Sequence, residues 1–97
     1  MTARFTRLAA HDAEARFDYL LERNPAAALA FRSELAALLA RLEAGELVGP
    51  WVHLEGLQRP VRTWPLYPLR VYYRPVPGGI VVLRVYHGAR KPIARLP

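Results

Sequence analysis

Apolar residues recur at helical spacing in two adjacent stretches of the first half of the chain. From about Ala10 to Arg23 the apolar positions that share one helix face are Ala13, Phe17, Leu20 and Leu21. From Pro25 to about Ala44 the apolar stripe consists of Ala28, Phe31, Leu35, Leu38, Leu39 and Leu42. Asn24 is a suitable cap for the second helix, and Pro25 suits its first position because no amide donor is needed there. Two amphipathic helices with almost no linker predict an αα-hairpin.

The second half alternates with the period of a β-strand. Residues 69–74 and 80–87 are the clearest strands, and the Pro-Val-Pro-Gly-Gly sequence of residues 75–79 turns the chain between them. The side chains expected to face the helices are Leu69, Val71, Tyr73, Val81, Leu83 and Val85, and those expected on the opposite face are Arg70, Tyr72, Arg74, Val82, Arg84 and Tyr86. Shorter strands are expected at residues 4–8 and 61–64.

These elements predict an α+β fold. An N-terminal αα-hairpin packs on one face of a small antiparallel β-sheet, in the order β-α-α-β-β-β, and the chain forms a single domain over residues 1–97. Residues from about 88 to 97 are expected to form a flexible basic tail. The stretch from Gly45 to Pro60 has no clear period, and Trp51 and Leu54 are expected to anchor it by packing.

Charge is distributed unevenly along the chain. The segment from Leu57 to Pro97 carries eight basic side chains and no acidic one, whereas the first 56 residues carry six basic and eight acidic side chains. This imbalance predicts an anionic partner, either nucleic acid or an acidic protein segment. The residues expected to bind it are Arg62, Arg70, Tyr72, Arg74, Arg84, Tyr86, Arg90 and Lys91. The alternative is an ordinary solvated face of an antiparallel sheet.

Several kinds of chemistry are not indicated. The chain has no cysteine, and its three histidines lack the spacing of a metal site, so neither a metal nor another cofactor is expected. A single serine, on a predicted helix, argues against a serine triad. The apolar runs are too short for a membrane helix and no secretory signal is visible, so we expect no membrane partner and a cytoplasmic location. His87, followed by Arg90 and Lys91, suits acid–base and phosphate chemistry, although a histidine that merely ends a strand is the simpler interpretation.

The order of these elements resembles the RelE/ParE superfamily of bacterial toxins, and is most similar to its ParE branch. The likeness covers nearly the whole chain. It rests on Asn-Pro-Ala-Ala-Ala at 24–28, Leu-Arg-Val-Tyr-Tyr-Arg at 69–74 and, most specifically, Arg-Val-Tyr-His-Gly-Ala-Arg at 84–90. The resemblance implies the toxin of a type II toxin–antitoxin system of the kind linked to plasmid stabilization. Such a toxin is neutralised in a hetero-oligomer by a cognate acidic antitoxin.

The resemblance leaves two targets. ParE-like toxins poison DNA gyrase without catalysing a reaction, whereas RelE-like toxins cleave mRNA on the ribosome. Arg70 and Arg90 fall where RelE-like members keep catalytic arginines, and His87 would join them in a ribonuclease. Lys91 is the only lysine, however, and no tyrosine follows Arg90, so the departures favour the gyrase inhibitor. Pro92 stands near the position where ParE-like chains often have an aspartate. A third possibility is a small nucleic-acid-binding module without toxicity.

Overall fold

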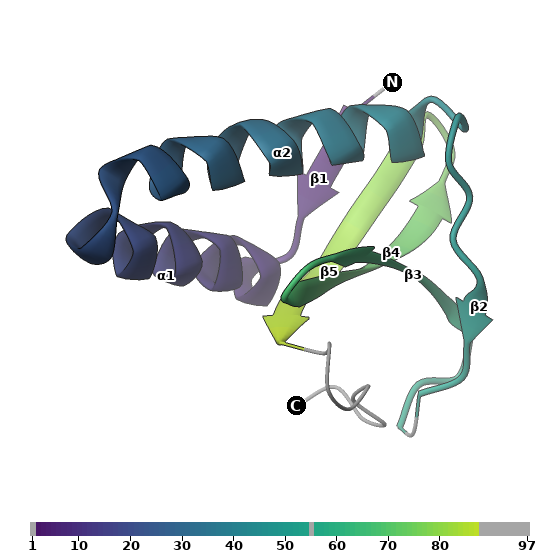
Figure 1. The fold of residues 1–97 in the computed structure, drawn as a ribbon. Coiled ribbons are helices and arrows are strands. Elements are labelled where there is room, and N and C mark those ends of the chain that lie inside the picture. The colour runs from purple at the N-terminus through teal and green to yellow at the C-terminus, as the bar shows by residue number, and fades with distance from the viewer. Residues whose placement is uncertain (1, 55, 88–97) are drawn as a thin grey trace.

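The protein folds as a helical hairpin laid on one face of a twisted sheet. A computed structural model describes residues 2–54 and 56–87, and the elements below belong to this part of the chain (Figure 1). They are β1 (Thr2–Phe5), α1 (Arg7–Arg23), α2 (Pro25–Glu43), β2 (Trp51–Val52), β3 (Val61–Leu66), β4 (Leu69–Val76) and β5 (Gly79–His87). The strands form a five-stranded sheet in the order β1-β5-β4-β3-β2. In these described ranges, no helix is long and apolar enough to cross a membrane.

Polar caps determine where the two helices begin. Thr6 caps α1 by accepting a hydrogen bond from the Ala9 amide at 3.1 Å, so the helix begins earlier in the chain than its apolar pattern predicts. Asn24 serves both helices: its amide donates to the Leu20 carbonyl at 2.6 Å, and its Oδ1 accepts from the Ala27 amide at 3.2 Å. One residue therefore ends α1 and begins α2, and the predicted αα-hairpin is confirmed.

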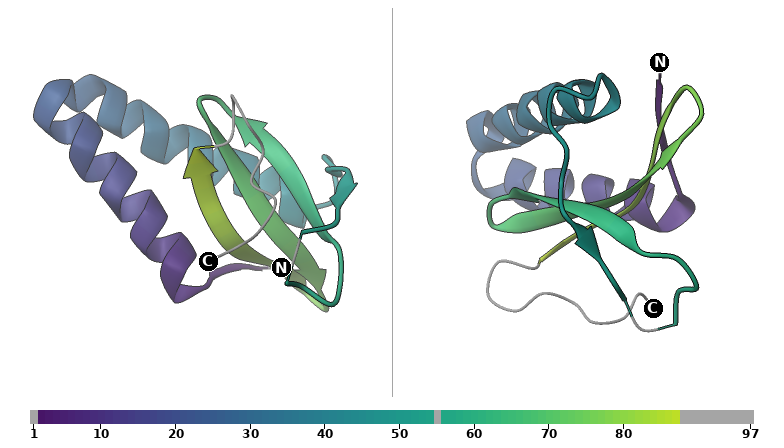
Figure 2. Two further views of the ribbon diagram at one scale, coloured as in Figure 1. Left: turned by 90° about the horizontal axis from the view of Figure 1, so that it is seen from below. Right: turned by 90° about the vertical axis from the view of Figure 1, so that its right-hand side faces the viewer.

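The main core lies between the helices and the near face of the sheet. The apolar stripe predicted for α2 is confirmed, because all six of its residues are buried. From α1, Ala9 is fully buried, and Ala13, Phe17 and Leu20 pack partly against the same cluster. The placement of Leu21 on the apolar face is wrong, since it is 45% exposed. Figure 2 shows the helices on one side of the sheet and the segment that contains β2 on the other.

The sheet confirms the predicted fold class and adds two details. Strands β3, β4 and β5 form an antiparallel meander, as the turn chemistry indicates. Strand β1 pairs in parallel with β5, with Thr2 opposite Gly79 and Phe5 opposite Val82, so the sheet is mixed. The parallel pairing arises because the helical hairpin carries the chain across the sheet before the meander begins. The short strand β2 pairs with the start of β3 and extends the opposite edge.

A β-bulge in β5 reverses part of the face assignment predicted from alternation. Arg84 lies opposite Tyr72, but the next residue of β4, Tyr73, lies opposite Val82, so Leu83 has no partner in the ladder. An extra residue in one strand shifts every preceding side chain to the other face. Strict alternation along residues 80–87 therefore cannot hold.

The consequence is visible in the burial of β5. Val82, predicted to face away from the helices, is fully buried in the main core. Leu83, predicted to face the helices, packs on the far side of the sheet, and Val81 is only partly buried. Val85 follows the bulge and does lie in the main core, as predicted.

Candidate partner-binding site

The sheet face opposite the helices carries a second, smaller core. Leu54, Val61 and Tyr72 are buried there. The side chains partly buried around them are Val52, Leu57, Leu83 and Tyr86. Leu54 anchors the irregular segment, as predicted, because it is only 4% exposed. The segment after β2 thus lies over a face that the sequence predicts to be open and basic.

Arg84 is committed to an ion pair with Asp12 of α1. Its Nε donates to Asp12 Oδ2 at 2.6 Å and its Nη2 donates to Asp12 Oδ1 at 3.0 Å, which is a bidentate geometry. The Val85 amide donates to Asp12 Oδ2 as well, at 3.1 Å. The hydrogen bond that Arg84 donates to Asp12 raises the pKa of the Arg84 guanidinium, against the opposing effect of burial. We call Asp12, Arg84 and the Val85 amide the Asp12 clamp; it fastens α1 to β5.

The residues predicted to bind a partner do not form one open surface. Tyr72 is 2% and Arg84 is 6% exposed, so these two side chains are parts of the interior rather than of an open face. The partly exposed members are Arg62, Arg70, Arg74 and Tyr86. Arg62 lies opposite Tyr73 in the ladder and therefore leaves the sheet on the helix side, away from Arg70 and Arg74. Arg90 and Lys91 lie outside the described residues, as does the predicted flexible tail.

Two residues named for a ribonuclease site lie at one end of the β4–β5 pair. Arg70 is opposite Tyr86, and Leu69 is opposite His87, which is exposed. The Nε of Arg70 donates to Thr63 Oγ1 at 3.2 Å, so part of this guanidinium is used within the sheet. The third residue, Arg90, is not among the described residues. Over residues 2–54 and 56–87, no three histidine, aspartate or glutamate side chains are grouped to hold a metal ion.

The segment that leads into β2 is held tightly against the sheet edge. The Gly49 amide donates to the Tyr73 hydroxyl at 2.9 Å, and Arg62 Nη1 donates to the Gly49 carbonyl at 2.6 Å. A Cβ at Gly49 would lie 2.1 Å from the Thr63 carbonyl oxygen, so only glycine fits this approach. The sequence shows Gly49-Pro50 but gives no indication that the hydroxyl of Tyr73, two strands away, accepts a hydrogen bond from the Gly49 amide.

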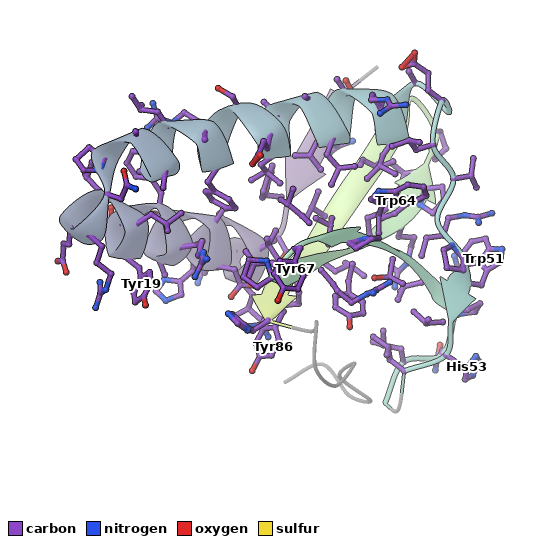
Figure 3. All side chains as sticks on the ribbon, viewed as in Figure 1. Tyr19, Trp51, His53, Trp64, Tyr67 and Tyr86 are labelled. Carbon is purple, nitrogen blue, oxygen red and sulfur yellow. The ribbon has the colours of Figure 1, made fainter. Side chains whose placement is uncertain are left out.

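This attachment leaves Trp51 exposed at the end of the molecule away from the tip of the helical hairpin (Figure 3). The prediction that Trp51 packs inside is wrong, because it is 51% exposed. The guanidinium of Arg62 lies over its ring, 3.9 Å from the ring centre, and so covers one ring face. Trp51 is therefore an exposed aromatic residue that Arg62 covers on one face, and tryptophan is enriched among the residues that dominate protein interfaces.

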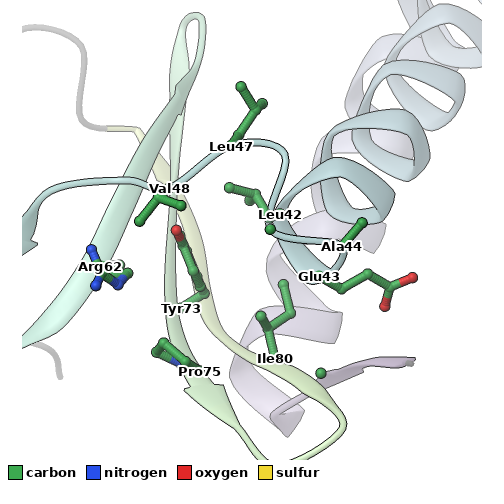
Figure 4. Close-up of a pocket in the computed structure, with 11 residues that line it drawn as sticks. Leu42, Glu43, Ala44, Leu47, Val48, Arg62, Tyr73, Pro75 and Ile80 are labelled. Carbon is green, nitrogen blue, oxygen red and sulfur yellow. The ribbon is translucent and has the colours of Figure 1, made fainter.

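Two hollows meet at this edge of the sheet. The larger, about 450 Å³, combines guanidinium groups with ring side chains; its lining is Trp51, Arg59, Pro60, Arg62, Arg74 and Pro75. The other, about 310 Å³, is a mainly apolar groove between the end of α2 and the sheet, and it shares Arg62 and Pro75 with the first (Figure 4). We call the larger hollow the Trp51 pocket. The side chains of Arg62 and Arg74 leave the sheet on different faces, yet both line this pocket.

A family model described as "ParE toxin of type II toxin-antitoxin system, parDE" matches residues 3–92. A solved structure titled "Chromosomal ParDE TA system from P. aeruginosa" is similar in fold, with a TM-score of 0.65 and 24% sequence identity, and the match covers 90% of this chain and 95% of that one. A search of curated proteins gave no match. The family match extends from the first strand through β5, the length over which the sequence resemblance was expected.

Proposed function

Since the chain belongs to the ParE family of type II toxin–antitoxin toxins, we propose that it inhibits DNA gyrase in the cytoplasm and is neutralised there by a cognate acidic antitoxin. The observation that carries this proposal is the family match over residues 3–92. The described fold, from β1 to β5, falls inside that match except for Thr2, the first residue of β1.

The charge distribution supports an acidic antitoxin as partner. Acidic side chains stop at Glu55 in the sequence, while arginines continue through the sheet. Among the described residues, the ion pairs of the chain are Arg84 with Asp12 and Arg23 with Glu22. The partly exposed arginines of β3 and β4 thus retain charge for an outside partner. A positive surface of this kind accelerates association with an acidic chain and helps to select it.

Gyrase is favoured over mRNA because the chain offers little for catalysis. Cleavage of RNA requires a base, an acid and cations placed around one phosphate. The chain has one lysine, and Arg70 already donates its Nε to Thr63. Inhibition by binding requires only complementary surfaces.

Induction of the protein in a bacterium that lacks the antitoxin tests the proposal. We expect growth arrest, altered plasmid supercoiling and gyrase-linked DNA breaks, with intact mRNA at the ribosome. The variant Leu39→Asp, which places a charge in the main core, serves as the unfolded control. Cleaved mRNA with unperturbed DNA would identify a ribosome-dependent ribonuclease instead. Undisturbed growth with folded protein would leave a nucleic-acid-binding module as the better description.

A further inference from the structure

The Trp51 pocket is a surface hollow with a definite chemical character. Three of its lining residues are arginines, and the other three present a tryptophan ring and two proline rings. We propose that it is the docking site for a short acidic segment of the antitoxin, which places one large apolar side chain between the rings and carboxylates on Arg59 and Arg74. This inference rests on the proposed function, because it names the partner's contact site.

The walls of the pocket are fixed before any partner arrives. Arg62 is held from two sides, over the Trp51 ring at 3.9 Å and through its 2.6 Å bond to the Gly49 carbonyl. The amide of Thr63 donates to the Pro50 carbonyl at 3.2 Å, which ties the backbone before Trp51 to β3. A preformed site avoids the entropic cost of ordering side chains on binding.

The charge of the pocket lacks an internal counterpart among the described residues. Neither Arg59, Arg62 nor Arg74 forms an ion pair within residues 2–54 and 56–87. The Nε of Arg74 is buried and has no hydrogen-bond partner in that part of the chain. The Arg74 guanidinium, which lines the pocket, therefore keeps its charge for a carboxylate that enters the pocket, and such a pair forms charge-assisted hydrogen bonds.

The arrangement suits a peptide better than a nucleic acid strand. Single-stranded nucleic acid needs a track of cations along its backbone and open aromatic faces for its bases. Here one face of Trp51 is covered by Arg62, and beyond the pocket Arg84 is paired with Asp12. Arg84 is thus not available to extend the cations of the pocket into a track along the sheet. About 450 Å³ between rings accommodates a large apolar side chain, while carboxylates on either side reach the arginines.

Backbone pairing is disfavoured at two positions of the pocket, which favours recognition through side chains. Pro60 and Pro75, which both line the pocket, have no amide hydrogen to donate to an added strand. The contribution of the acidic segment is therefore expected to come from its carboxylates and its apolar side chain rather than from a backbone ladder.

The test uses the full-length protein and defined fluorescent probes. The main probe is a labelled peptide of about ten residues with glutamates on both sides of a Leu-Trp pair, and its binding is measured by fluorescence anisotropy. We expect saturable binding that Arg59→Ala, Arg74→Gln and Trp51→Ala each weaken about tenfold. Arg41→Ala is the matched control because Arg41 is an exposed arginine of α2, outside the pocket, and it should leave the affinity within about twofold. Circular dichroism melts verify that each variant is folded.

Several outcomes would overturn the proposal. An equal loss in Arg41→Ala would mean that net charge alone attracts the peptide. Failure of the wild-type protein to bind, or binding unchanged when serines replace the Leu-Trp pair, would remove the apolar pocket from the explanation. Tighter binding of a labelled oligothymidylate through the same residues would identify a nucleic-acid site. If the wild-type protein arrests growth but does not bind the peptide, the docking site alone is refuted. If it binds the peptide specifically but does not affect growth, the proposed toxin function is refuted.

Discussion

The Asp12 clamp gives the sharpest prediction about stability. Replacement of Asp12 by alanine removes the carboxylate that receives Arg84 and the Val85 amide. The Asp12 and Arg84 side chains are only 12% and 8% exposed. The variant therefore leaves a charged guanidinium and a backbone donor without their acceptor in a place that water reaches poorly. Arg84 Nη1 already lacks a partner among the described residues, so no spare acceptor is present there.

The expected cost follows from the burial of this pair. Removal of one partner from a buried ion pair costs about 3–5 kcal/mol, because the remaining charge is uncompensated. That is a large share of the roughly 5–15 kcal/mol that stabilises a domain. For a chain of this length, about 1 kcal/mol corresponds to roughly 4–8 °C in melting temperature. Asp12→Ala should therefore melt at least about 12 °C below the wild-type protein.

Urea and thermal unfolding, followed by circular dichroism, measure the effect. Asp18→Ala is the matched control, since Asp18 is an exposed aspartate of the same helix, and it should stay within about 0.5 kcal/mol. The double variant Asp12→Leu/Arg84→Met removes both charges and should recover most of the stability. A cost below about 1 kcal/mol for Asp12→Ala, or no recovery in the double variant, would refute the clamp as a buried, coupled pair.

The pH dependence of the clamp has a definite sign on the arginine side. The pKa of Arg84 is higher in the folded protein than in the unfolded chain. The stability that this difference contributes is fully present below the pKa of Arg84 in the unfolded chain, and it is lost only as pH rises through the pKa of Arg84 in the folded protein. Arginine keeps its proton well into the alkaline range, so the Arg84 guanidinium contributes no loss of stability on alkaline titration to about pH 10.

Three further experiments, with four variants, test other parts of the fold. Gly49→Ala should destabilise by about 1–3 kcal/mol, measured by urea unfolding, because its Cβ would meet the Thr63 carbonyl oxygen at 2.1 Å; unchanged stability would contradict the close approach. Leu39→Ala should cost about 2–5 kcal/mol and Leu29→Ala less than about 0.5 kcal/mol, since the first is 7% and the second 57% exposed; equal costs would contradict the helix orientation. Asn24→Ala should cost about 0.5–2 kcal/mol and lower the helical circular dichroism signal on heating, because it removes the cap of α2; a melt identical to wild type would show that Pro25 alone suffices.

The helical hairpin could be predicted because its determinants are local. A cap, a proline and an apolar stripe at helical spacing all act within a few residues of one another. The start of α1 was harder to predict from the sequence. The Thr6 hydroxyl caps the helix and also donates to the Leu83 carbonyl of β5 at 3.0 Å, a contact between residues far apart in the chain. A threonine with only local partners would show the same sequence pattern.

The faces of β5 and the role of Arg84 depend on long-range structure. The bulge inserts Leu83 without a partner, and no proline, glycine or charge marks that position in the sequence. Asp12 and Arg84 are 72 residues apart, so their pairing cannot be inferred from spacing. The Trp51 pocket could not be predicted for a similar reason. The backbone before Trp51 is held by hydrogen bonds of Gly49 with Tyr73 and Arg62, which belong to other strands.

The Asp12 clamp also changes what the strongest sequence resemblance means for function. The string at residues 84–90 begins with Arg84 and Val85, and in this chain the side chain of one and the amide of the other belong to the Asp12 clamp. The first part of that string therefore preserves the fold. Loss of toxicity in an Arg84 variant would report unfolding before it reported a lost contact, and must be judged against the melting temperature. Arg59 and Arg74 have no internal ion pair in the described part of the chain, so their variants separate binding from stability.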